Sequence, residues 1–441
     1  MPFSTQTMPF ATKLPIKLRC LLSRWPGAGL LTASALLLVS MTIVNAGNYL
    51  FNLILGRWLG PAAFADVNLI VTLLLMSILI TATLQTVSAK FAATYTAAAD
   101  LERVSGLRRW LGRWAGGVGA VISVIFVLGA PLWQDFFHTH SAWPFVLLGL
   151  GLPFYLAQGV DRGILQGQKR FGLLAVSYQA EMWVRLAAAL ALVALGWSVN
   201  GAVGGITLSL VAAWLVARRV GFSLPRANIL PSPDRLNIWR FAGPANAALM
   251  GQILINNSDI LIVKHFFAAD QAGHYAALAL IGRIVFFATG SVVAVMFPTV
   301  AQKQQQGEPH RQLLAVSLGV VALASLGIIG LTFFFPELII GLLFGRTYLS
   351  IAPLLWLYAV ATMLYALANV VVNYRLSLGY GAGSVLAVLA GLAQVIALWF
   401  WHDNLLTIVM IQICLMITFL AILLVWDGWL WLNLTKVRHA K

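Results

Sequence analysis

Long apolar runs follow one another along almost the whole chain, and they constrain the fold more than any other feature. A helix needs about 20 apolar residues to cross a bilayer, and a lipid-exposed segment must satisfy its backbone polar groups internally. The composition agrees, with 61% hydrophobic residues, only 9% charged residues and a mean hydropathy of +0.89. We place crossings at residues 28–55, 63–95, 114–133, 141–167, 173–196, 199–217, 236–267, 272–302, 312–335, 350–374, 382–400 and 405–432. The sequence therefore predicts an all-α polytopic membrane protein with about 12 transmembrane helices. The runs are continuous rather than alternating, which excludes a transmembrane barrel.

The basic residues indicate the orientation of the chain. Of its 28 Lys and Arg residues, only Arg57, Lys264 and Arg346 fall on the side opposite the N-terminus. Four more lie within crossings, and the rest fall on the N-terminal side. Cytoplasmic loops accumulate Lys and Arg, so we expect a multi-pass protein of the cell (inner or plasma) membrane with both termini in the cytoplasm.

The basic segments also predict a partner. Residues 1–27 form a basic cytoplasmic N-terminal tail, and the formal net charge of the chain is +15. We expect this tail and the inner loops to contact anionic lipids. In a chain this apolar, the positive charge does not indicate nucleic acid.

A proline-containing cytoplasmic connection at residues 218–235 divides the crossings into two sets of six. It separates an N-lobe at 28–217 from a C-lobe at 236–432, and a cytoplasmic C-terminal tail follows at 433–441. Two lobes of six crossings share one orientation, so a pseudo-two-fold axis along the membrane normal relates them. Substrate sites form between such halves.

A weak internal repeat supports the two lobes. Asn48 aligns with Asn257, and residues 59–66 align with residues 268–275. Both segments are predicted turns between a long first helix and a long second helix of their lobe. The spacing of these turns is a stronger indication than the few identical residues.

One polar face crosses the seventh apolar run. Gln252, Asn256 and Asp259 are spaced by four and three residues, so they share one side of a helix. A charge at mid-bilayer depth costs about 2.5–3.5 kcal/mol on insertion scales, so this face should meet protein or a water-filled cavity. We interpret it as the lining of a polar path through the membrane.

Three other crossings carry polar stripes. Such stripes either join neighbouring helices or line a shared hydrated cavity, and four of them in one chain favour the cavity. They comprise Asn45, Asn48 and Asn52 in the first crossing, Thr81, Gln85 and Ser88 in the second, and Thr362, Tyr365, Asn369 and Asn373 in the tenth.

Two ionisable residues lie on consecutive crossings at comparable depth. Arg283 can form a structural pair with Asp259. Alternatively, Arg283 offers a bidentate donor for phosphate oxygens, and Asp259 is the candidate that responds to a coupling proton or sodium ion. Lys90, near the inner end of the second crossing, either snorkels to the surface or lines the cavity.

A second group of charges is interpreted as a structural ion network. Glu181 and Arg185 are four residues apart and can neutralise each other on one helix. Asp161 and Arg162, near the inner end of the fourth crossing, are expected to join them.

Several chemical functions lack their motifs. Without a Walker motif the chain is not expected to hydrolyse ATP, and no cofactor is expected beyond a coupling H⁺ or Na⁺. With only two cysteines, Cys20 in the N-terminal tail and Cys414 in a late crossing, neither a disulfide framework nor a metal site is expected. His138 and His140 are interpreted as a surface pair rather than metal ligands. With no catalytic constellation on one side of the membrane, we expect a transporter rather than an enzyme.

Six stretches, in their order and spacing, resemble one known family. They are residues 48–61, 162–171, 181–186, 259–275, 297–298 and 344–348. Across them the chain resembles the polysaccharide-export (Wzx-like) flippases of the MOP superfamily, which are related to multidrug exporters of the MATE type and to the lipid II flippase. The resemblance implies two six-helix lobes that open alternately to either side. It also implies a polyprenyl-pyrophosphate-linked oligosaccharide as substrate and an ion gradient as driving force.

The resemblance also bears on site residues and partners. Related flippases place basic residues against the pyrophosphate, and by chemistry Arg283 and Lys90 are the candidates here. A glycan polymerase and glycosyltransferases are plausible partners. The lipid II flippases of this superfamily are expected to have fourteen helices and several cavity arginines. Twelve crossings and one clear candidate arginine therefore argue against a resemblance to that branch.

Other functions remain open. One is a small-molecule cation antiporter of the same superfamily, although basic residues offset Asp259, the main acid within the crossings. Another, of a different class, is a membrane glycan polymerase or ligase, which would need a larger outer loop than this chain has. A passive scramblase or an assembly scaffold is a third.

Overall fold

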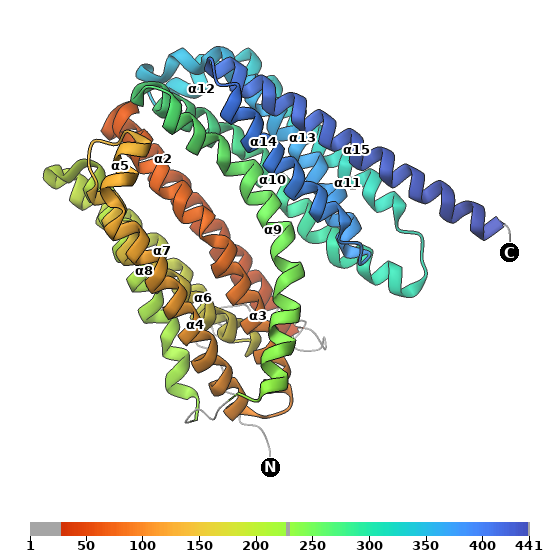
Figure 1. Cartoon of the computed structure of the whole chain (residues 1–441). Coiled ribbons are helices and arrows are strands. Elements are labelled where there is room, and N and C mark those ends of the chain that lie inside the picture. The colour runs from red at the N-terminus through yellow and green to blue at the C-terminus, as the bar shows by residue number, and fades with distance from the viewer. Residues whose placement is uncertain (1–27, 226–229, 440–441) are drawn as a thin grey trace, which may run out of the picture.

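The computed structural model describes residues 28–225 and 230–439, which form helices and no strands. The predicted tail at 1–27 lies outside the described residues. The N-lobe contains α2 (Ala28–Met76), α3 (Ile78–Ala97), α4 (Leu101–Leu128), α5 (Ala130–Phe137), α6 (Trp143–Gly167), α7 (Phe171–Leu192), η2 (Val193–Trp197), α8 (Ser198–Ala217) and η3 (Arg218–Ser223). The C-lobe contains α9 (Ser232–Phe266), α10 (Ala269–Gln306), α11 (Arg311–Phe334), α12 (Pro336–Leu343), η4 (Arg346–Ile351), α13 (Ala352–Ser377), α14 (Ala382–Phe400) and α15 (Leu405–His439). The two lobes stand side by side (Figure 1).

The described helices account for the twelve predicted crossings. Nine helical stretches are long and apolar enough to cross a membrane. Two of them, Leu36–Ala97 and Phe171–Gly221, each contain two crossings, because the chain leaves helical geometry at Gly60 and Gly196. Both glycines have a positive φ, which glycine adopts without steric cost. The 35-residue helix α9 supplies the remaining crossing.

Several helices extend beyond the predicted crossings. The helix of the third crossing begins at Leu101, before the predicted crossing at 114–133, since the Asp100 side chain caps it by accepting from the Arg103 backbone N–H at 2.9 Å. Helix α9 begins at Ser232, inside the predicted connection. The predicted tail at 433–441 is helical as far as His439, because α15 continues to that residue.

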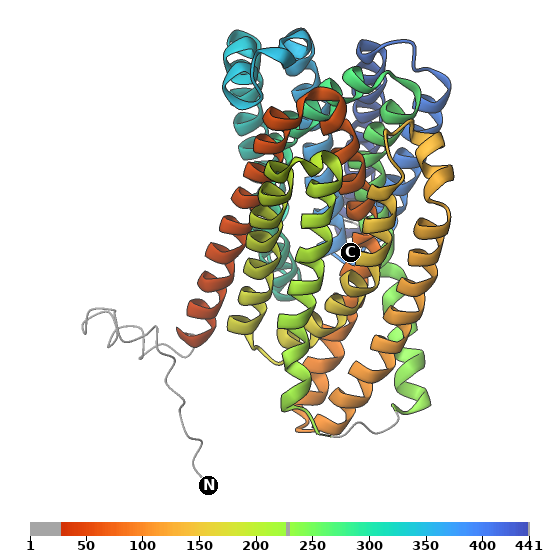
Figure 2. The ribbon, with the colours of Figure 1, turned by 90° about the vertical axis from the view of Figure 1, so that its left-hand side faces the viewer.

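Two short helices, α5 and α12, were not predicted. Each has a proline in its first turn, where a missing N–H costs nothing. Both lie at the end of the molecule where α2 turns at Gly60 and where α9 passes to α10 (Figures 1 and 2). Because the lobes contact each other there, we call it the closed end.

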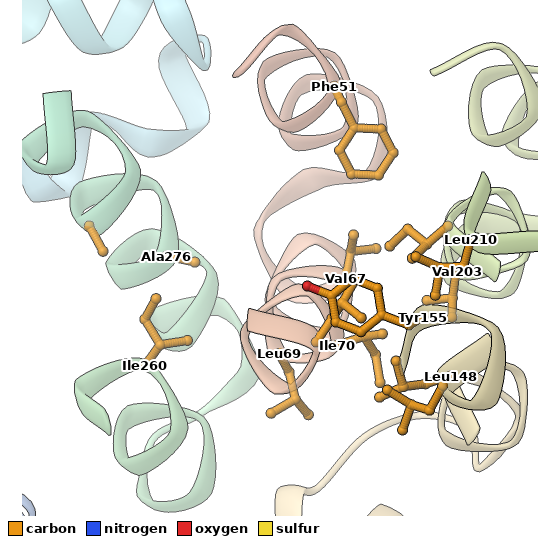
Figure 3. Packing of buried hydrophobic residues seen from close by; sticks show 14 of the residues in the cluster. Phe51, Val67, Leu69, Ile70, Leu148, Tyr155, Val203, Leu210, Ile260 and Ala276 are labelled. Carbon is orange, nitrogen blue, oxygen red and sulfur yellow. The ribbon is translucent and has the colours of Figure 1, made fainter. Parts of the chain in front are cut away.

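The apolar core is continuous across the two lobes through α2. Phe51, Val67 and Ile70 of α2 lie between N-lobe residues and C-lobe residues (Figure 3). On one side are Leu148 and Tyr155 of α6 and Val203 and Leu210 of α8, and on the other are Ile260 of α9 and Ala276 of α10. Helix α2 therefore packs against helices of both lobes.

Within the N-lobe, α6 lies directly against α3 along a stripe of glycines. A Cβ on Gly159 would lie 2.8 Å from the Thr81 carbonyl oxygen, and a Cβ on Gly167 would lie 2.5 Å from that of Ala89. A Cβ on Gly163 would likewise overlap Gln85. Small residues at this spacing let membrane helices approach closely.

Candidate functional site

A cavity of about 300 Å³ lies between the lobes, and it is lined by Gln252 of the predicted stripe on α9 and by three members of the stripe on α13. This volume is at the lower end of the range typical of ligand sites, about 300–1,000 Å³. Its lining combines one N-lobe helix, α3, with four C-lobe helices. The lining residues are Thr83, Thr86, Leu249, Gln252, Tyr365, Asn369, Val372, Asn373, Leu376, Ala387 and Phe419. The polar members are uncharged, so the cavity is suited to a neutral, hydroxyl-rich group.

Helices α9 and α13 position the amides of this cavity. Asn373 Nδ2 donates to the carbonyl of Asn369 at 2.8 Å and lies 3.0 Å from its side-chain oxygen. One turn beyond Gln252, Asn256 Nδ2 donates to the Gln252 carbonyl at 2.9 Å. Asn256 itself is not among the lining residues. Because its donor is held by the preceding turn, Asn373 keeps its own amide oxygen available as an acceptor.

The stripe on the second crossing does not face this cavity. Gln85 Nε2 donates to Tyr178 at 2.9 Å and to Gln166 at 3.2 Å, both within the N-lobe. Thr81 and Ser88 lie against the glycines of α6. This stripe joins helices of one lobe, which was the alternative interpretation. Thr83 and Thr86, on another side of the same helix, reach the cavity and were missed because threonine carries little signal in an apolar run.

The stripe on the first crossing lies at the contact between α2 and α7. Asn48 Oδ1 accepts from Arg185 Nη1 at 3.1 Å, and Asn52 Nδ2 donates to the Asn48 carbonyl at 2.8 Å. Asn45 is exposed. None of the three lines the cavity. Lys90 is also exposed, with its ammonium 5.7 Å from the Phe91 ring.

Asp259 and Arg283 meet inside the C-lobe. Asp259 is 1% exposed, and its Oδ2 accepts from Tyr275 at 2.8 Å and from Tyr358 at 3.0 Å. Arg283 lies 4.0 Å from Oδ1 and donates to the carbonyl of Asn256. The structural pair that the sequence allowed is therefore present, and the Arg283 side chain keeps 13% exposure.

The predicted ion network is divided into two parts. Arg162 and Arg185 both pair with Glu181, at 2.8 and 2.7 Å, which leaves one positive charge in excess among these three side chains. Asp161 does not join them and instead pairs with Arg108 at 2.7 Å. Because α4 begins at Leu101, Arg108 is a helical residue facing α6 rather than part of a loop.

Two further ion pairs were not recognised in the sequence. Asp66 of α2 and Lys264 of α9 form an ion pair of 2.7 Å across the lobes, and both side chains are 3% exposed. Arg375, predicted to lie in an inner loop, is 5% exposed and pairs with Asp427 of α15. These pairs join residues far apart in sequence, so spacing carries no signal for them.

Within residues 28–225 and 230–439, no group of His, Cys, Asp and Glu side chains could hold a metal ion. His138 and His140 lie at the closed end. The ring of His140 lies 3.2 Å from Asp66 Oδ2, so this histidine belongs to an interlobe contact.

The family of the chain follows from a match over more than half of its length. Residues 114–353, which run from the second half of α4 to the start of α13 and include the polar stripe on α9, match the family described as "Polysaccharide biosynthesis protein". The chain belongs to this family. The predicted resemblance to polysaccharide-export proteins is thereby confirmed.

Two relatives from Mycobacterium tuberculosis share part of this sequence. They are the uncharacterized protein Rv1510 of strain H37Rv and the uncharacterized protein MT1558/MT1560 of strain CDC 1551. Each is 27% identical to the chain over 271 residues, or 58% of this chain. The match spans 60% of the length of each relative.

The fold is that of MATE transporters of the MOP superfamily. An inward-facing multidrug resistance MATE transporter has a TM-score of 0.75 with 15% identity, over 88% of this chain and 95% of that protein. An outward-facing structure of such a transporter has a TM-score of 0.64 with 15% identity, over 89% of this chain and 94% of that protein. These matches confirm the predicted fold class of a multi-pass helical membrane protein.

Proposed function

We propose that this member of the polysaccharide biosynthesis family is a flippase that moves a polyprenyl-pyrophosphate-linked oligosaccharide from the inner to the outer leaflet. The observation that carries the proposal is the uncharged, amide-lined cavity between the lobes. Amides both donate and accept, so Gln252, Asn369 and Asn373 match the hydroxyl groups of sugars. The orientation with both termini in the cytoplasm rests on the positive-inside rule.

The buried pair of Asp259 and Arg283 supports a role for the C-lobe in ion coupling. Asp259 is held by two tyrosine hydroxyls and lies at 4.0 Å from Arg283, a distance that a small rearrangement can change. In our proposal a proton or sodium ion on Asp259 weakens its attraction for Arg283. The guanidinium then becomes available to phosphate oxygens.

The closed end and the structural comparisons support an inward-facing state. The lobes meet at the closed end, which the basic-residue distribution places outside the cell, and the structural likeness is greater to the inward-facing transporter than to the outward-facing one. We infer that substrate enters from the cytoplasmic side in this state. Opening of the closed end would then expose it to the outer leaflet.

The proposal is tested in proteoliposomes that contain a labelled polyprenyl-pyrophosphate oligosaccharide. Outer-leaflet exposure of the label is followed with and without a proton or sodium gradient. We expect gradient-dependent flipping in the wild type and at least a tenfold loss in the double variant Asn369→Leu/Asn373→Leu. The matched control is Thr418→Val, which removes an exposed hydroxyl of α15 that bonds only within its own helix.

The second candidate is a small-molecule cation antiporter, which the likeness to multidrug transporters favours. Its cavity would need acidic groups to attract an organic cation, whereas the polar lining residues here are uncharged. Gradient-driven uptake of a cationic dye without glycolipid flipping would replace our proposal by this one. Flipping without any gradient would leave a passive scramblase.

A further inference from the structure

We propose that Asp66 and Lys264 form an ion-pair lock that holds the lobes together at the closed end, and that separation of this pair opens the cavity to the opposite side of the membrane. Asp66 lies on the second crossing of the N-lobe and Lys264 on the first crossing of the C-lobe, with 2.7 Å between the carboxylate and the ammonium. The inference rests on the proposed transport cycle, and it names residues that control one step of it.

The lock is built from both lobes and from the loop that follows α5. Asp66 Oδ2 lies 3.4 Å from the backbone N–H of His140 and 3.2 Å from its ring Nδ1. Lys264 Nζ also reaches the carbonyl of His138 at 3.5 Å. These contacts attach the α5–α6 loop to the pair, and the contact between Lys264 and His138 must break when the lobes separate.

Two interlobe contacts, which we call clamps, flank the lock, and the predicted pseudo-two-fold axis would relate them. Arg57, on the first crossing of the N-lobe, donates to the carbonyls of Gly341, Leu342 and Leu343 at the end of α12 in the C-lobe. The second clamp lies at the corresponding place in the other lobe. His265, on the first crossing of the C-lobe, donates from Nδ1 to the Phe136 carbonyl at the end of α5, at 2.5 Å.

The sequence repeat supports this symmetry. The alignment that places Asn48 on Asn257 places Arg57 one residue from His265. In both clamps a basic side chain meets the C-terminal carbonyls of a short helix, where partial negative charge is concentrated. Each lobe therefore binds the short helix of the other lobe through the same kind of contact, a basic side chain on the helix's C-terminal carbonyls.

An ion pair between the lobes can separate reversibly, because water can hydrate both charged groups once they are apart. Water rehydrates Asp66 and Lys264 once the lobes part, and this hydration offsets the lost attraction. While the end is closed, however, removal of one partner leaves the other buried without a counter-charge. Single substitutions should therefore shift the equilibrium toward the open state, whereas removal of both charges should restore much of the closed state.

The test measures the accessibility of a buried position at the closed end. Ala276 of α10 is 2% exposed and faces α2 (Figure 3), so a cysteine there reports on separation of the lobes. The Ala276→Cys reporter is placed in a background with Cys20→Ser and Cys414→Ser. Its reaction rate with a membrane-impermeant maleimide is measured in nanodiscs, where both faces are accessible.

We expect Asp66→Asn and Lys264→Met each to raise the reaction rate at least tenfold, and the double variant Asp66→Asn/Lys264→Met to reverse most of this increase. Glu308→Gln, which breaks an exposed pair with Lys303, is the matched control and should leave the rate unchanged. Equal rates in the wild type and both single variants would overturn the lock, as would a double variant as reactive as the singles.

Two controls separate this outcome from others. If a single variant aggregates, Gly273→Ala provides a second route, because a Cβ at Gly273 would overlap the Pro61 carbonyl and force the same end apart without changing a charge. It should also raise the rate, and an unchanged rate would count against the closed-end geometry. The assay needs no substrate, so a lock that responds as expected while glycolipid is not flipped would leave the lock in place and refute the proposed substrate.

Discussion

The guanidinium of Arg283 on α10 lies 4.0 Å from the carboxylate of Asp259 on α9. Two residues placed by sequence spacing on consecutive crossings are thus neighbours in a region where each would be costly alone. The distance is longer than that of a tight pair, and Tyr275 and Tyr358 hold the carboxylate from the other oxygen. Asp259 Oδ2 thus has two hydroxyl donors, whereas Oδ1 has no hydrogen-bond partner among the described residues and only the Arg283 guanidinium at 4.0 Å.

Replacement of Arg283 should therefore destabilise the C-lobe moderately. Arg283→Gln is expected to lower the free energy of unfolding by about 1–3 kcal/mol, because Asp259 loses its nearest cation but keeps two hydroxyl donors. Denaturant unfolding in detergent measures the change. Arg109→Gln, at an exposed position of α4, serves as the control. An unchanged stability would mean that Asp259 does not depend on Arg283.

Glu181 should contribute more to stability than Arg283, because it forms ion pairs with two arginines. Glu181→Gln leaves Arg162 and Arg185 without their shared carboxylate. Loss of one member of a buried ion pair costs about 3–5 kcal/mol, and we expect the same order here. The measurement is the unfolding midpoint relative to Glu308→Gln, whose exposed pair contributes at most about 1 kcal/mol. A similar midpoint for both variants would contradict a buried triad.

Gly163 should not tolerate a side chain. A Cβ at this position would overlap the Gln85 carbonyl of α3, so Gly163→Ala is expected to cost about 1–3 kcal/mol through overpacking. Gly112→Ala in α4 is the matched control, since no atom lies within 4 Å of its Cβ position. That change should be neutral or should stabilise by up to about 1 kcal/mol through helix propensity. Comparable losses in both variants would refute the close packing of α6 on α3.

His310 should make stability depend on pH. It precedes α11, outside the crossing, and its ring Nδ1 lies 2.8 Å from the Tyr374 hydroxyl. Burial lowers the pKa of His310, and the Arg375 guanidinium lowers it further, while Asp427 acts in the opposite direction. The unfolded chain then binds this proton more readily, so stability is lost as pH falls from the ordinary value of 6.5 through the folded pKa.

The measurement is the melting temperature at about pH 7.5 and about pH 5.5, which bracket the ordinary histidine pKa. We expect the wild type to lose more on acidification than His310→Gln, which cannot take up this proton. Other groups titrate in the same range, but they contribute equally to both proteins. Parallel pH profiles would show that His310 is not held in its neutral form.

Local patterns predicted part of the cavity lining in the C-lobe. The helical spacing of Asn369 and Asn373 identified the side of α13 that lines the cavity, whereas only Gln252 of the predicted stripe on α9 is among the lining residues. The same argument was incomplete for Gln85, because a polar side chain in a membrane helix is satisfied equally well by a neighbouring helix or by water. Only the glycines of α6, which bring that helix against α3, decided between the two.

The sequence by itself determined the crossings, their number and their grouping into two lobes. These depend on properties of single segments, namely the length of an apolar run and the placement of turns and basic residues. Beyond Asp259 with Arg283 and Glu181 with Arg185, only the tertiary structure decided which charges meet. Asp66 with Lys264, Arg108 with Asp161 and Arg375 with Asp427 are contacts between different helices. In a membrane a buried charge must find a counter-charge or water, but the sequence does not specify which distant helix supplies it, because that depends on how the helices pack.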